Sequence, residues 1–61
     1  MNIQQLAMDY SLMTDQDLAG ELEFYLADRN LYGAQMAPLA RTRLNTRIEL
    51  IRAELSKRAA R

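Results

Sequence analysis

The feature that most constrains the fold is the apolar pattern of residues 37–61. Aliphatic side chains recur there at intervals of four, four, three and four positions, at Ala40, Leu44, Ile48, Ile51 and Leu55. Because successive residues of an α-helix are separated by about 100°, these positions form one stripe roughly 80° wide, whereas a strand would need strict alternation. Pro38 suits a first helical turn, where its missing N–H needs no partner. The pattern predicts one long helix over residues 37–60.

A second helix start is indicated by a capping motif earlier in the chain. Thr14 is a favoured N-cap residue, and Asp17, three positions later, can reach back to the cap amide. Met13 and Leu18 are placed on either side of the cap for a hydrophobic staple. Several independent features therefore agree that a helix begins after Thr14.

The helix that this motif begins is predicted to span residues 15–31. Its main apolar stripe has helical spacing and comprises Leu18, Leu22, Tyr25 and Leu26. We expect Gly33 to end the helix in the left-handed conformation. The link to Pro38 is short, and short links place consecutive helices side by side in antiparallel orientation.

Residues 2–10 carry a third, shorter helical pattern, with apolar side chains at Ile3, Leu6, Ala7 and Tyr10. The expected fold class is therefore all-α: a short N-terminal helix plus an antiparallel helical hairpin. These three helices would form one small domain over residues 1–61. Because a single core of this size is marginal, we expect the domain to dimerise into a helical bundle.

Opposite charges are concentrated in the two parts of the chain, although the whole chain is neutral. Residues 1–36 hold six acidic residues and one arginine, a net charge of −5, and residues 37–61 hold seven basic and two acidic residues, a net charge of +5. The simplest interpretation is that an acidic helix pairs with a basic helix. An arginine edge of the long helix would then lie against an acidic edge formed by Asp17, Glu21 and Asp28.

The other interpretation of the charge pattern is that the basic helix binds an anion. Arg41, Arg43 and Arg47 are the candidate contacts, and the last two are one helical turn apart. Lys and Arg side chains are sufficient for contacts to nucleic-acid phosphates. Arginines from two copies of the chain could also hold a small anionic nucleotide in bidentate geometry. The acidic part of the chain argues against this interpretation, because it would repel phosphate.

The composition argues against catalysis. The chain has no Cys and no His, so the commonest general base, the thiol nucleophile and the soft metal ligands are missing. It contains no Gly-rich phosphate loop and no Asp-rich calcium loop. We therefore expect no enzyme activity, no metal and no cofactor. The sequence also shows no apolar run of membrane-spanning length and no signal peptide, so we expect a cytoplasmic protein without membrane contact.

More apolar surface is predicted than a two-helix hairpin buries. Phe24 and Leu31 lie nearly opposite the main stripe of their helix, and Leu39 and Leu50 lie well off the stripe of theirs. A monomer rarely exposes a contiguous apolar patch unless the patch binds something. The short N-terminal helix can cover at most one of these two sides, so we expect the four residues to include the contact with a second copy of the chain or with a foreign protein.

Together these features predict a non-catalytic protein–protein interaction module, an adaptor or inhibitor that occludes a partner's surface and that forms a homodimer. Its size and composition are typical of small bacterial or phage accessory proteins. The alternative is an arginine-dependent binder of nucleic acid or of a small anionic nucleotide. Salt dependence separates the two functions, because phosphate binding weakens steeply as salt is added.

Overall fold

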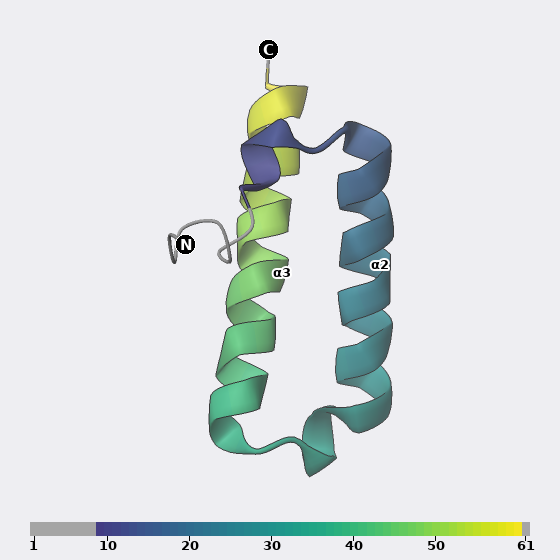
Figure 1. The fold of residues 1–61 in the computed structure, drawn as a ribbon, viewed down its shortest axis with the longest axis vertical. Helices are drawn as coiled ribbons and strands as arrows, with labels where there is room; N and C mark the ends of the chain where they lie inside the picture. Colours follow the sequence, from purple (N-terminus) through teal and green to yellow (C-terminus); the bar gives the residue numbers. More distant parts are fainter. Residues whose placement is uncertain (1–8, 61) are drawn as a thin grey trace, which may run out of the picture.

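The described part of the chain is helical and is built on two long antiparallel helices. The computed structural model describes residues 9–60. Its elements, in chain order, are η1 (Tyr10–Leu12), α2 (Asp15–Tyr32), η2 (Gly33–Gln35) and α3 (Pro38–Ala59). Figure 1 shows α2 and α3 side by side, connected through η2 at one end, with η1 against α3 near the other end.

This arrangement confirms the predicted helical hairpin. The predicted helix over residues 2–10 lies outside the described residues, apart from its last two positions. Of these, Asp9 caps the short 3₁₀ helix η1 and Tyr10 is its first residue.

Thr14 is the N-cap of α2, as predicted. The backbone N–H of Asp17 donates to Thr14 Oγ1 at 3.0 Å, which satisfies one of the amides that the first helical turn leaves without a partner. Met13 packs against the buried cluster of Tyr10, Leu18 and Ile51, on the side of the core where the staple was predicted, while a direct contact between Met13 and Leu18 stays a prediction. In this described turn the Asp17 carboxylate makes no return hydrogen bond to the cap amide. Asp is one methylene shorter than the Glu that usually completes a capping box.

The prediction for Gly33 was wrong. Its φ of −55° and ψ of −41° are right-handed, and its N–H donates to the Arg29 carbonyl, so α2 continues directly into η2. Tyr32, with φ of −124° and ψ of −1°, marks the change from α2 to η2, and the chain becomes extended at Met36 and Ala37, whose ψ angles are 143° and 148°. Pro38 accounts for the extended backbone of Ala37, because a proline disfavours helical backbone in the residue before it. No left-handed glycine is needed to end the helix.

The core lies between α2 and α3, with η1 covering one end. Leu18, Ile48 and Ile51 are fully buried, and Leu44 and Tyr10 are 7% exposed. Four partly buried side chains pack against the cluster of Tyr10, Leu18 and Ile51: Met13, Leu22, Tyr25 and Leu55. These positions confirm the predicted stripes at Leu18, Leu22 and Tyr25 of α2 and from Leu44 to Leu55 of α3, while Leu26 is only partly buried.

Ala40 is the exception on the stripe of α3, because it is exposed. It lines an open hollow together with Met36 and Arg43. A methyl group is too small to fill this hollow, so the buried part of the stripe begins one turn later, at Leu44.

The two long helices are not joined by ion pairs along their length. Within residues 9–60, one ion pair crosses between them, from Arg58 Nη1 to Asp15 Oδ1 at 2.6 Å. The other three ion pairs lie within α3. The prediction that the acidic edge pairs with an arginine edge was therefore wrong. Arg47 instead donates to the hydroxyl of Tyr25 at 3.4 Å, so an aromatic side chain takes the place of a carboxylate.

Candidate functional site

Large apolar side chains are exposed on both long helices. The four predicted contact residues are among them: the exposed fraction is 66% for Phe24, 70% for Leu31, 60% for Leu39 and 51% for Leu50. Leu12 and Tyr32 are exposed as well. The exposure shows that the hairpin leaves these side chains uncovered, while their role in a contact stays a prediction.

The outer face of α2 carries a regular apolar seam. We call it the α2 seam, and its residues are spaced by four, three and four positions: Gly20, Phe24, Ala27 and Leu31. All four are exposed, and on a helix they lie opposite Leu18 and Leu22, which face the core. This spacing is the heptad pattern that helices use to pack against one another. The α2 seam therefore has the geometry of a helix-binding surface.

Gly20 serves no visible purpose inside the molecule. A Cβ built at this position meets no atom of the described residues within 4 Å, apart from its own stretch of helix, so no packed neighbour in that part of the chain requires a glycine there. Glycine in a helix interior costs about 1 kcal/mol relative to alanine. The structure offers no intramolecular compensation for this cost, and the open space lies on the α2 seam.

Phe24 makes one aromatic contact within the molecule although it is largely exposed. Its ring makes an edge-to-face contact with the ring of Tyr25, with 5.7 Å between the ring centroids. The guanidinium of Arg47 lies over the other aromatic ring, 5.9 Å from the Tyr25 centroid. This chain of contacts connects the exposed phenyl group to α3.

Acidic side chains border the α2 seam. By helical geometry, Glu23 lies on one side of the seam, and Asp17 and Asp28 lie on the other. None of these three carboxylates belongs to an ion pair among residues 9–60. The whole of α2 contains five acidic residues and one arginine, a net charge of −4. The seam is therefore apolar in its centre and negative at both edges.

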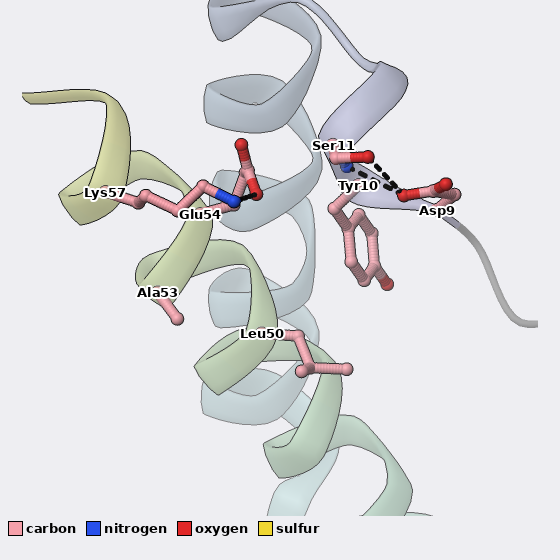
Figure 2. Close-up of a pocket in the computed structure, with 7 residues that line it drawn as sticks. All are labelled: Asp9, Tyr10, Ser11, Leu50, Ala53, Glu54 and Lys57. Carbon is pink, nitrogen blue, oxygen red and sulfur yellow. Dashed lines mark hydrogen bonds and ion pairs between the residues drawn. The ribbon is translucent and has the colours of Figure 1, made fainter.

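The outer face of α3 is less apolar. Leu50 and Ala53 line a shallow groove there with residues that are mostly polar: Thr42, Asn45, Thr46 and Glu49. The same two residues also line a second groove of about 350 Å³ beside η1, together with Tyr10. Figure 2 shows this second groove, in which Leu50 extends below the Tyr10 ring. The ring is buried, and this burial raises the pKa of the Tyr10 hydroxyl.

Polar contacts hold η1 against the end of α3. Arg58 Nη2 donates to the carbonyls of Tyr10 and Ser11 at 3.2 and 3.3 Å. Arg58 Nε donates to Glu54 Oε2 at 2.9 Å, and this hydrogen bond holds the pKa of Glu54 below its usual range. Sequence reasoning found only the Glu54 pair, because the other partners are more than forty residues away.

The cap of η1 is a second local polar contact. The backbone N–H and the hydroxyl of Ser11 both donate to Asp9 Oδ1, at 3.1 and 2.6 Å. The hydroxyl bond, followed by the amide bond, lowers the pKa of Asp9. Asp9 therefore fixes the turn that places Tyr10 in the core.

The three candidate anion-binding arginines are not brought together. Arg43 and Arg47 line one open hollow of about 300 Å³ between the helices, but Arg41 does not. Arg41 instead donates to the Met36 carbonyl at 3.5 Å. Asp28 lines the same hollow as the other two arginines, so its carboxylate reduces the positive potential there. The hollow carries mixed charge, which is unlike a dedicated phosphate site.

The described residues were also compared with the requirements of a metal site and of a membrane-spanning helix. Within residues 9–60, no three Asp or Glu side chains lie close enough together to hold a metal ion. Neither long helix in that range combines the length and the apolar character needed to cross a membrane. Comparison with known proteins found no matching family model, no matching curated protein and no matching solved structure.

Proposed function

We propose that this chain is a non-catalytic protein–protein interaction module that acts by covering part of a partner's surface. The observation that carries the proposal is the α2 seam, whose two large side chains, Phe24 and Leu31, are about two-thirds exposed. A helix of a small protein normally turns one apolar face to its own core and leaves the opposite face polar. A second apolar face at heptad spacing is the pattern of helices that bind other helices.

Self-association is part of this proposal, and we assign it to the outer face of α3. If two copies pair their α3 helices around a two-fold axis, Leu39 of one copy can lie opposite Ala53 of the other. In the same register Leu50 lies opposite Thr42, so each large side chain meets a smaller one. The charges on this face are mixed, which avoids like-charge repulsion between the copies. A homodimer of this kind would also enlarge a core that is small for one chain.

Sedimentation equilibrium at micromolar concentration tests the dimer. Leu50→Glu places a charge on the α3 face, and Gln16→Glu adds the same charge to an exposed position of α2 as a matched control. We expect a dimer mass for the unmodified chain and for Gln16→Glu, and a monomer mass for Leu50→Glu. A monomeric unmodified chain would exclude the dimer. A dimeric Leu50→Glu variant would exclude this face as its interface.

The second candidate function is arginine-dependent binding of nucleic acid or of a nucleotide. One observation favours it, namely that Arg43 and Arg47 line a common hollow. Titration of a labelled oligonucleotide at low and at physiological salt separates this function from protein binding. Affinity that falls steeply with salt, and that Arg43→Ala and Arg47→Ala both reduce, would support anion binding. The interaction-module proposal expects no measurable affinity in either buffer.

A further inference from the structure

We propose that the α2 seam binds one basic amphipathic helix of a partner protein, whose own apolar seam is bordered by Lys and Arg. This inference rests on the proposed function and specifies the partner. It is carried by two independent properties of α2: the sizes of the side chains on the seam and the charge of its edges.

The side-chain sizes leave room for a helix to approach closely. Gly20 and Ala27 are small, whereas Phe24 and Leu31 project from the exposed surface. Small residues at a helix interface allow the two backbones to come near each other, and large residues then fill the spaces between side chains of the partner. Because a Cβ at Gly20 meets nothing inside the molecule, the free space at that position is available to a partner.

The charge of the edges selects a basic partner. Asp17, Glu23 and Asp28 border the seam and form no ion pair among residues 9–60. No basic residue of α3 forms an ion pair with them, since the single ion pair between the helices is made by Asp15 and Arg58, although Asp28 shares a hollow with Arg43 and Arg47. Lys or Arg on the flanks of a partner helix would meet Glu23 on one side and Asp17 on the other, neither of which is ion-paired within residues 9–60. At exposed positions such pairs contribute mainly to specificity and association rate.

A second copy of the chain fits this face less well. If two α2 seams paired, acidic edges would lie against acidic edges, and like charges across an interface disfavour a complex. The outer face of α3 from another copy carries Thr42 and Thr46 in place of a continuous apolar seam. The outer faces of α2 and α3 point away from each other. If the outer α2 face of one copy bound the outer α3 face of the next, the copies would therefore form an open filament and not a closed dimer.

The test uses the full chain and three labelled synthetic peptides of about 21 residues, or three heptads. All three peptides carry the same leucine seam, and their flanking positions hold Arg, Gln or Glu. The chain has no Trp to serve as an intrinsic fluorophore, so the label is placed on the peptide. Binding is then measured by the fluorescence anisotropy of the labelled peptide. We expect the Arg peptide to bind at least tenfold more tightly than the Glu peptide, with the Gln peptide between them.

Variants of the chain test whether the Arg peptide binds to the outer face of α2. We expect Phe24→Ala to weaken binding of the Arg peptide by roughly tenfold or more, as for a central aromatic contact. Leu12→Ala removes an even more exposed side chain, from η1, which has no part in the proposed interfaces, and should leave binding unchanged. Glu23→Gln should reduce the difference in affinity between the Arg peptide and the Glu peptide, because it removes one negative charge from the edge of the seam.

Gly20→Ala separates a binding role from a structural one. We expect this variant to raise the thermal unfolding midpoint, since alanine favours helix and its Cβ meets no other atom. The same methyl group should weaken binding of the Arg peptide, because it holds the partner backbone away. A purely structural glycine would not give this combination of higher stability and lower affinity.

The outcomes distinguish the two levels of the proposal. Equal affinity for all three peptides would overturn the basic partner and preserve an apolar interaction module. Binding that survives both Phe24→Ala and Gly20→Ala would overturn the α2 seam as the site. An unmodified chain that binds no peptide and sediments as a monomer would overturn both the basic partner and the proposed function.

Discussion

At the scale of single residues, the cap of α2 is the simplest feature to test. The Thr14 hydroxyl oxygen accepts a hydrogen bond from the Asp17 amide. Replacing an N-cap threonine with alanine leaves that amide without its partner, so we expect Thr14→Ala to reduce the free energy of unfolding by about 1 kcal/mol. Thermal unfolding followed by circular dichroism measures the change. An unchanged midpoint would mean that the hydroxyl does not stabilise the helix start.

Glu54 provides a prediction about pH. The hydrogen bond from Arg58 holds the pKa of Glu54 below its ordinary value of 4.5. A carboxyl group whose pKa is lower in the folded state stabilises that state above its ordinary pKa, and this contribution is lost as the pH falls through the folded-state pKa. We therefore expect the thermal unfolding midpoint to decrease when the pH is lowered below about 4.5. The decrease should be smaller in Glu54→Gln, which lacks the titrating carboxyl group.

Glu23→Gln is the control for this titration, because Glu23 is exposed and forms no ion pair among residues 9–60. Its pH profile should follow that of the unmodified chain. If Glu54→Gln loses stability on acidification as fully as the unmodified chain, the pair with Arg58 does not contribute to the acid transition.

At the scale of the helices, α3 is attached to α2 mainly by buried aliphatic side chains. Ile51 is fully buried and belongs to the central cluster with Leu18 and Tyr10. Truncating such a side chain removes its transfer free energy and leaves a cavity, so we expect Ile51→Ala to cost about 2–5 kcal/mol. That is a large fraction of the stability of a small domain, which is typically about 5–15 kcal/mol.

Urea titration of Ile51→Ala beside Leu12→Ala measures this difference. Leu12 is 82% exposed, so its truncation should change the free energy of unfolding by less than about 0.5 kcal/mol. Similar losses in the two variants would show that the hairpin does not depend on the buried stripe.

At the scale of the whole molecule, Arg58 connects three elements. Its guanidinium reaches two carbonyls of η1, the carboxylate of Asp15 at the start of α2, and Glu54 within α3. A lysine keeps the charge but presents a single ammonium, which cannot span these separate acceptors. We therefore expect Arg58→Lys to lower the thermal midpoint and to loosen η1, as measured by faster hydrogen exchange at Met13, whose amide donates to the Tyr10 carbonyl.

Arg52→Lys is the matched control, because Arg52 is exposed and its ion pair lies within its own helix, with Glu49. It should leave both measurements unchanged. If Arg58→Lys behaves in the same way as this control, charge alone accounts for the role of Arg58, and the forked geometry does not matter.

The sequence by itself determined the features that depend on neighbours a few residues away. The cap at Thr14, the apolar stripes and the Glu54–Arg58 pair all arise within one or two helical turns, where the spacing along the chain sets the distance in space. The hairpin also followed, because a short link leaves two adjacent helices few other arrangements. The helical spacing also indicated that Phe24 and Leu31 would lie opposite the core-facing stripe of their helix, and their exposure confirms this position.

Only the tertiary structure decided which distant groups meet. Net charges of opposite sign suggested that α2 and α3 pair along their length, yet a single ion pair joins them, since the rotation of each helix about its axis is set by burial of the apolar stripes. The contacts of Arg58 with η1 and the open space that the described residues leave beside Gly20 likewise depend on how the elements are placed. Apolar burial dominates this placement because surface ion pairs each contribute little, so exposed charges take the positions that the packing leaves to them.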